Sequence, residues 1–148
     1  MEHHRWMGCG CNACQTDYGP DAFAANIAGM ARQNQNFRTA FWTGERLQMT
    51  LMTIPPCGEI GVEMHPNTEQ FIRVEEGRGL VRMGACKEKM DVQHPLCAGD
   101  AVFVPCGTWH NVLNSGSSPL KLSSVYAPTQ HARGTIHRIK ADSEREED

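Results

Sequence analysis

The sequence predicts a single all-β domain, an antiparallel sandwich or barrel preceded by a short N-terminal arm or helix. Three observations lead to this prediction. The chain has 148 residues, of which 40% are hydrophobic and 21% charged, as is usual for one globular domain. Between residues 36 and 128, short runs of strand-like composition follow one another without a helical pattern between them. Gly and Pro separate these runs at short intervals, as turns between strands require.

Residues 1–35 form the first predicted region. Its first twenty residues have little apolar periodicity and read as an irregular arm with three closely spaced cysteines, Cys9, Cys11 and Cys14. After the arm, apolar residues recur at roughly helical spacing from Phe23 to Ala31, with Asp21 as the candidate N-cap. We expect a helix of about two or three turns here, because Gly29 and the polar residues that follow oppose a longer one.

Residues 36–128 form the second region, the predicted barrel. Eight segments have a strand pattern: 37–43, 47–54, 60–65, 70–76, 79–84, 100–105, 109–114 and 120–127. The turn residues Pro, Gly, Asn and Ser fall between them, including a loop at 94–99. We expect positive φ at Gly77, Gly79 and Gly107, where the chain must reverse tightly.

Residues 129–148 form the third region, a charged C-terminal tail. The last eight residues, ADSEREED, carry little apolar surface to bury, so we expect the tail to be frayed. His131 and His137 lie beyond the barrel and are placed at its edge rather than in a site.

Charge and cysteine content limit the partners and the compartment. A net charge of -3 without a run of Lys and Arg predicts no nucleic-acid binding, and no apolar stretch is long enough to cross a membrane. Seven cysteines, an odd number, without a signal-type apolar segment predict reduced thiols and a cytoplasmic location. We expect four of these cysteines to be small, half-buried hydrophobes, namely Cys57, Cys86, Cys97 and Cys106.

The segment EMHPNTEQ places polar groups where a strand normally has apolar ones. Because side chains alternate along a strand, Glu63 and His65 point to the same face. If residues 65–68 make a turn, Gln70 returns opposite this pair, and His110 starts a later strand after a Pro-Cys-Gly turn. Carboxylate, amide and imidazole groups are suitable donors for a divalent metal ion. We therefore predict a metal site in which strands hold the donors.

The strand around His110 resembles the second motif of the cupin superfamily. That motif is Gly, five residues, Pro, any residue, Gly, two residues, His, three residues and Asn. The chain matches it at every spacing, with Gly99, Pro105, Gly107, His110 and Asn114. The resemblance covers roughly residues 37–127 and implies the cupin fold, a jelly-roll or double-stranded β-helix barrel.

The first cupin motif is matched in its frame but not in all its ligands. The usual pattern is His-x-His, three or four residues, Glu, six residues and Gly. Glu63 stands at the first His, His65 at the second, and Gln70 at the Glu when the count starts from Gly77. Glu69 fits only the three-residue spacing, so we favour Gln70. The metal ligands implied are therefore Glu63, His65, Gln70 and His110.

The resemblance also implies a range of functions. The chain is similar to mannose-6-phosphate isomerase-like cupins, and small single-domain cupins include sugar-phosphate isomerases, uronate-processing enzymes, dioxygenases and ligand-binding modules. The donor set, with Glu63 in place of a His, predicts a divalent ion, namely Mn, Fe, Ni or Zn. We expect an enzyme with isomerase or dioxygenase chemistry on a small oxygenated or sugar-like compound. The alternative is a non-catalytic module that binds or senses a metal or a small ligand. The resemblance further implies a homodimer.

Two other interpretations remain open at this point. Without a metal, Glu63 and His65 would pair with each other or with Arg73, and His110 would bind a backbone carbonyl. Separately, a second metal site is conceivable in the N-terminal arm, where His3 and His4 accompany Cys9, Cys11 and Cys14. This run lacks the paired spacing of a standard zinc module, so we favour a reduced segment without metal.

Overall fold

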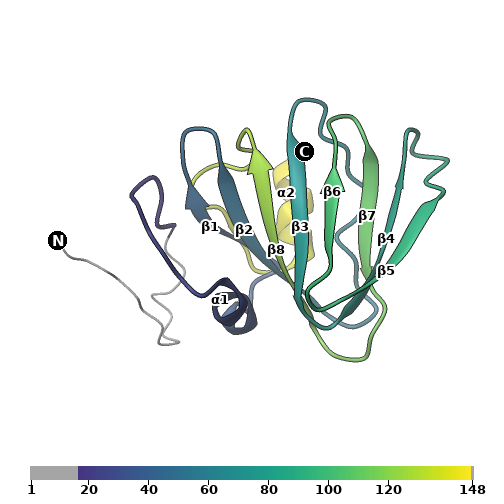
Figure 1. Cartoon of the computed structure of the whole chain (residues 1–148), viewed down its shortest axis with the longest axis horizontal. Coiled ribbons are helices and arrows are strands. Elements are labelled where there is room, and N and C mark those ends of the chain that lie inside the picture. The colour runs from purple at the N-terminus through teal and green to yellow at the C-terminus, as the bar shows by residue number, and fades with distance from the viewer. Residues whose placement is uncertain (1–16, 148) are drawn as a thin grey trace.

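The computed structural model describes residues 17–147 and shows two antiparallel β-sheets packed against each other, with a helix near each end of that range (Figure 1). The elements in chain order are α1 (Ile27–Gln33), β1 (Arg38–Thr43), β2 (Gln48–Ile54), β3 (Glu69–Glu76), β4 (Arg78–Gly84), β5 (Val92–Cys97), β6 (Ala101–Val104), β7 (Trp109–Asn114), β8 (Leu120–Ala127), β9 (Ile136–His137) and α2 (Lys140–Glu147). The larger sheet has the order β6-β3-β8-β2-β1-β9 and the smaller one β5-β4-β7. The predicted all-β antiparallel architecture is confirmed, although the two sheets do not close into one hydrogen-bonded barrel.

The main core lies between the two sheets. In β3, buried Gln70, Ile72 and Val74 alternate with exposed Glu69 and Arg73, which is the two-residue period of a strand with one buried face. Val102 and Val104 of β6 alternate in the same way, and they join residues of the smaller sheet in one apolar cluster. The apolar alternation of the sequence therefore determines which face of each strand is inside.

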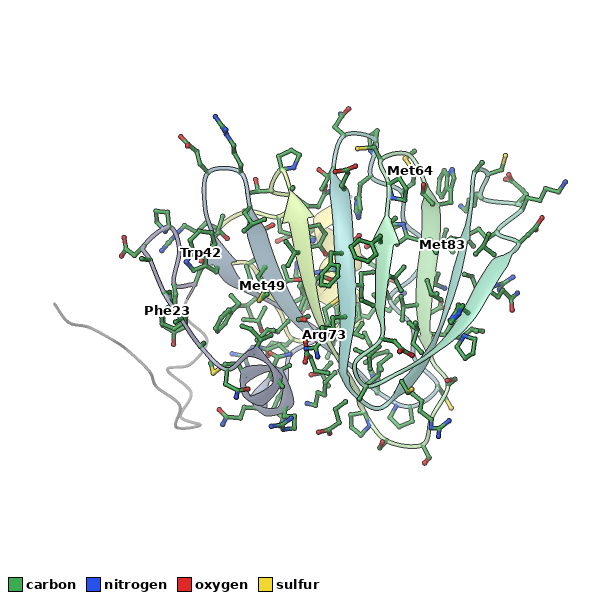
Figure 2. The ribbon with its side chains drawn as sticks, in the orientation of Figure 1. Phe23, Trp42, Met49, Met64, Arg73 and Met83 are labelled. Atoms are coloured by element: carbon green, nitrogen blue, oxygen red, sulfur yellow. The ribbon has the colours of Figure 1, made fainter. Side chains whose placement is uncertain are left out.

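A second apolar cluster lies on the outer face of β1 and β2. The segment before α1 stacks Tyr18 on Phe23, with ring centroids 4.2 Å apart, and both rings meet Phe41 edge-on. Figure 2 shows Phe23, Trp42 and Met49 gathered on this side of the molecule. Both faces of β1 are consequently covered, which the strand pattern alone does not reveal.

The prediction for residues 60–65 is wrong in its pairing. These residues do not form a hairpin with β3. They run along the edge of β7, where Glu59 bridges Leu113 and Glu63 bridges His110. Gly61, with φ of +106°, interrupts the ladder, so the segment is not a regular strand. Glu63 and Gln70, which were predicted to share a hairpin, thus belong to opposite sheets.

Four local predictions also differ from the structure. Helix α1 begins after Asn26, whose side chain accepts a hydrogen bond from the Gly29 amide, and not at Asp21. The loop expected at 94–99 is largely strand β5, which tolerates Pro95 because it lies at a sheet edge. Gly77 and Gly107 have positive φ as predicted, whereas Gly79 does not. The four cysteines expected to be half-buried are free and exposed: Cys57, Cys86, Cys97 and Cys106.

The C-terminal region is ordered, in contrast to the frayed tail that we expected. Strand β9 pairs with β1, and α2 follows it. The Asp142 carboxylate accepts hydrogen bonds from the amides of Arg138 and Ile139, which satisfies donors at the start of the helix. Lys140 and Glu144, which are one helical turn apart, form an ion pair on the surface of α2. The charged residues therefore stabilise a helix locally, without an apolar face.

The division into residues 1–35, 36–128 and 129–148 remains a prediction. The N-terminal residues proposed for a second metal site, Cys9, Cys11 and Cys14 with His3 and His4, lie outside the described residues. Neither described helix has the length and apolar character needed to cross a membrane.

Candidate metal centre

Glu63 and His110 face each other because their backbones are paired. The Glu63 amide donates to the His110 carbonyl and the His110 amide donates to the Glu63 carbonyl, each at 2.9 Å. Residues paired in this way project their side chains from the same face. His65 lies two residues after Glu63, and its carbonyl accepts from the Gly107 amide of the Pro-Cys-Gly turn at 2.9 Å. Local backbone bonding thus fixes three candidate donors at one end of the sheet.

The three side chains form a compact group of metal-ligating atoms. His65 Nε2 lies 3.5 Å and His110 Nε2 3.9 Å from Glu63 Oε1, and one ligand atom of each residue lies within 4.8 Å of the others. The two histidines are 9% and 1% exposed, and the Glu63 side chain is 16% exposed. The group is therefore largely shielded from water but reachable at the carboxylate.

The tautomer of His110 leaves an electron pair in this group. Its Nδ1 lies 2.9 Å from the Thr108 carbonyl oxygen, which only accepts hydrogen bonds, so Nδ1 carries the proton. Nε2 then presents its lone pair towards the Glu63 carboxylate and has no hydrogen-bond partner. A lone pair facing a carboxylate inside a protein is unfavourable unless a cation lies between them. The residues present therefore fit a bound metal ion.

Gln70, the fourth predicted ligand, lies on the opposite sheet. In register it pairs with Tyr126 of β8, so the two side chains share a face, and the Tyr126 ring lies 6.1 Å from that of His65. The amide nitrogen of Gln70 donates to Ser124 Oγ at 3.3 Å, while its Oε1 is buried without a partner. Glu69, the other candidate, is exposed on the opposite face. Gln70 as a metal ligand remains a prediction that this placement favours.

The protonation states suit a cation. Burial raises the pKa of Glu63, but the contact with His65 and the charge of Arg38 outweigh burial and hold that pKa below its ordinary value. Burial lowers the pKa of His110, against the opposing effects of the Thr108 carbonyl and of Glu63. At neutral pH the site thus contains an ionised carboxylate and a neutral imidazole, the forms that bind metals.

Arg38 is an important residue of this region that the sequence analysis missed. It is 1% exposed, and its Nη2 lies 3.7 Å from Glu63 Oε2. The metal-free interpretation named Arg73 for this role, but Arg73 pairs with Glu75 at 2.8 Å. Arg38 pairs in register with Met52, a residue of the main core, so its side chain faces the interior.

Two histidines placed at the edge of the barrel also lie in its interior. The His131 ring is 5.3 Å from the Tyr126 ring and 6.4 Å from that of His137. His131 Nε2 is buried without a partner, whereas His137 Nε2 lies 3.0 Å from Glu146 Oε1. Neither histidine belongs to a sequence motif that predicts a site, because both lie in the C-terminal region, beyond the two cupin motifs. The surroundings of the site are therefore more polar than the apolar strand faces indicated.

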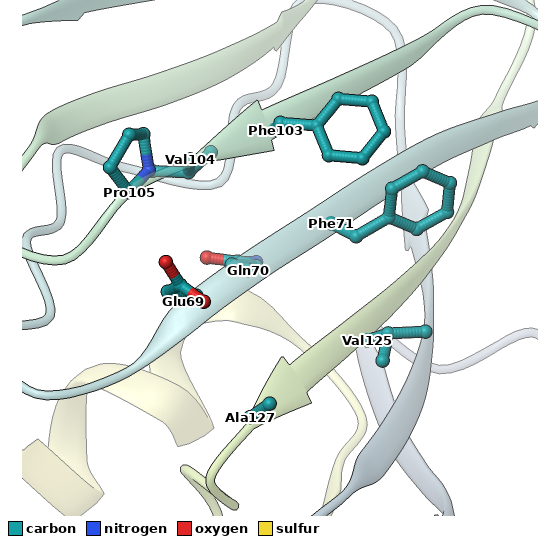
Figure 3. A pocket seen from close by; sticks show the side chains of 8 residues that line it. All are labelled: Glu69, Gln70, Phe71, Phe103, Val104, Pro105, Val125 and Ala127. Carbon is teal, nitrogen blue, oxygen red and sulfur yellow. The ribbon is translucent and has the colours of Figure 1, made fainter.

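Two apolar hollows in the described part of the surface lie away from Glu63, His65 and His110. One, of about 290 Å³, is on the outer face of the larger sheet, where the Phe71 and Phe103 rings lie 5.0 Å apart (Figure 3). A second, also of about 290 Å³, is lined by Phe23, Trp42 and Met49 among others. Both are apolar and neither includes a candidate metal ligand other than Gln70.

Comparison with known proteins agrees with the motifs. The family model of the cupin domain matches residues 50–126. The uncharacterized protein YrkC of Bacillus subtilis (strain 168) is 49% identical over 137 residues, which are 93% of this chain and 74% of YrkC. The crystal structure of BH2720 from Bacillus halodurans has a TM-score of 0.87 at 49% identity, over 88% of this chain and 98% of BH2720.

A more distant structure extends the fold relationship. It is that of the sugar phosphate isomerase from a cupin superfamily, SPO2919, from Silicibacter pomeroyi. It is 20% identical, covers 58% of this chain and 53% of its own, and has a TM-score of 0.50. At that identity the likeness shows the fold alone. Together with the two sheets, these matches confirm the predicted double-stranded β-helix.

Proposed function

The chain belongs to the cupin family, and from this premise we propose that it is a divalent-metal-binding enzyme acting on a small oxygenated or sugar-like compound. The observation that carries the proposal is the set of buried atoms without hydrogen-bond partners, His65 Nε2, Gln70 Oε1 and His110 Nε2, beside the ionised Glu63. Buried polar atoms in proteins are nearly always satisfied, and a shared cation would satisfy these together.

The four proposed ligands are one carboxylate, one amide and two imidazoles. This donor set is compatible with Mn, Fe, Ni or Zn and does not select among them. When bound there, the ion supplies Lewis acidity for an isomerase-type reaction or a site for dioxygenase-type oxygen chemistry. The Thr108 carbonyl orients His110 for this role.

Other groups near the site remain uncharged at neutral pH. Burial raises the pKa of Tyr126, so its phenol stays protonated, and it interacts with the side chains of Thr50 and Ser124. Burial, followed by the charge of Arg38, lowers the pKa of His131 to about 3, so its imidazole is neutral. His131 Nε2, which has no hydrogen-bond partner, therefore offers a hydrogen bond to a small ligand without adding charge to the interior.

Metal analysis after anaerobic purification tests the proposal. We expect about one ion per chain in the wild type and clearly less in Glu63→Ala and His110→Ala, because each removes a ligand. His94→Ala is the matched control, since His94 is exposed on β5. Full metal content in both ligand variants would show that the assignment is wrong.

The identity and exchange of the ion separate the reaction classes. Iron would favour dioxygenase-type chemistry, and zinc or manganese isomerase-type chemistry. An enzyme also requires a coordination position that water or substrate can occupy. Water proton relaxation of the Mn(II)-loaded protein measures this directly. A shell without exchangeable water would favour the non-catalytic binding module.

We also propose that the chain is a cytoplasmic homodimer that does not bind nucleic acid. The four free cysteines in the described part of the chain fit a reducing compartment. The outer face of the larger sheet carries Phe103, which is 73% exposed, beside Phe71, and apolar exposure of this kind favours association. Light scattering should give the mass of a dimer for the wild type and that of a monomer for Phe103→Glu. A monomeric wild type would contradict the proposal.

A further inference from the structure

Arg38 is a buried cation with one edge of its guanidinium open. Its Nη1 donates to Ser143 Oγ at 2.9 Å and lies 3.2 Å from His137 Nδ1. Its Nη2 has only longer contacts, 3.7 Å to Glu63 and 4.0 Å to the sulfur of Met52. Its Nε is buried and has no hydrogen-bond partner. The Nε–Nη2 edge therefore lacks a close hydrogen-bond acceptor, and its geometry matches a planar acceptor with two oxygens.

Glu63 balances the positive charge of Arg38 only while Glu63 does not bind a metal ion. Within the part of the chain that the structure describes, Glu63 is the carboxylate that forms an ion pair with Arg38. Glu146 is exposed and reaches Arg38 only through His137. A divalent ion on Glu63 would change the charge of this interior group from zero to plus two. Buried charge without a partner is costly, so a loaded site would favour an anionic ligand.

A second unpartnered group lies in the same interior. His131 Nε2 is buried without a hydrogen bond, and the Tyr126 ring lies 5.3 Å from the His131 ring and 6.1 Å from the His65 ring. Among the described residues, Arg38 Nε and His131 Nε2 are thus unsatisfied buried atoms that do not belong to the proposed metal ligands. A ligand that satisfies both must carry at least two polar atoms.

We propose that Arg38 and His131 form an anion subsite beside the metal centre, and that the ligand of this protein is a small carboxylate with an adjacent oxygen, such as a 2-hydroxy or 2-oxo acid. The inference rests on the proposed metal function. The carboxylate matches the open edge of Arg38 and supplies the negative charge. The adjacent oxygen allows the same molecule to approach the metal, where four protein donors leave two positions of a six-coordinate ion free.

Glycolate and glycolamide test the subsite, because they differ in charge but hardly in size. We expect the Mn(II)-loaded wild type to bind glycolate at least about tenfold more tightly than glycolamide, as measured by isothermal titration calorimetry. Arg38→Met should abolish this preference while retaining Mn(II), since removing a positive charge does not weaken cation binding. Arg78→Met is the matched control, because Arg78 is exposed on β4, and it should behave like the wild type.

The outcomes separate this inference from the proposed function. A wild type that holds Mn(II) but binds both compounds equally would refute the subsite alone, and no variant is needed for that result. A wild type that holds no Mn(II) would refute both proposals. If Arg38→Met does not fold, Arg38→Lys keeps the charge but loses the planar edge, and we expect it to bind Mn(II) and to bind glycolate more weakly than the wild type. Wild-type glycolate affinity in Arg38→Lys would contradict the role of that edge.

Discussion

The ion pair between Glu63 and Arg38 gives a quantitative prediction for the metal-free protein. The charged atoms lie 3.7 Å apart, with Arg38 buried and Glu63 mostly buried. At an effective dielectric constant of about 20, Coulomb's law gives about 4.5 kcal/mol as a ceiling for their attraction. The contact is longer than a hydrogen bond, and Arg38 also contacts His137, so we expect a coupling free energy of about 2 kcal/mol.

A double-mutant cycle measures this coupling. Glu63→Gln and Arg38→Met should each lower the free energy of unfolding by about 3 kcal/mol, because each leaves one charge of the pair without its partner. The double variant should lose about 2 kcal/mol less than the sum of the single variants. Urea unfolding with EDTA present gives the four values, and equal m-values confirm that the denatured states are comparable. Additivity within about 0.5 kcal/mol would show that the two charges do not interact, and would refute the reasoning.

Three further predictions concern the site, a turn and the last helix. Gln70→Ala should lower metal affinity about tenfold in competition with a metal indicator, and unchanged affinity would remove Gln70 from the ligand set. Gly77→Ala should cost about 1–3 kcal/mol more in urea unfolding than Gly99→Ala. Both glycines have φ of +96°, so the backbone strain of an alanine is the same at both positions. A Cβ at 77 would lie 2.8 Å from the Pro119 carbonyl oxygen, whereas one at 99 would meet nothing within 4 Å. Equal losses of stability in the two variants would contradict the steric argument. Hydrogen bonds from two backbone amides lower the pKa of Asp142, so its stabilisation of α2 is complete above the ordinary pKa of 3.8 and is lost as pH falls through the lowered value. The NMR shifts of these amides should titrate in the wild type and not in Asp142→Asn.

The features predictable from sequence are those set by local pattern. Two-residue alternation of apolar side chains identified β3 and β6, and the turn glycines Gly77 and Gly107 mark reversals that need positive φ. His110 starts β7 as expected, because the turn before it fixes where the strand begins. Asn114 ends that strand, and its side-chain oxygen accepts a hydrogen bond from the Gly116 amide.

The features that were missed depend on long-range contacts. The partner of residues 60–65 is β7, some fifty residues later, and strand composition gives no information on that choice. Arg38 faces the interior only because residues from the N-terminal segment cover the other face of β1. His131 reaches the site through the C-terminal region, whose charged composition gave no sign that it is ordered.

An anomalous diffraction map of a crystal soaked in Mn(II) is the most direct test of the metal centre. We predict a single strong peak bounded by Glu63, His65, Gln70 and His110, with donor atoms at about 2.0–2.3 Å from the ion. The peak should disappear in His110→Ala and persist in His94→Ala. A map with no peak among these four residues, or with Mn(II) bound only elsewhere on the chain, would contradict the central claim that they form a cation site.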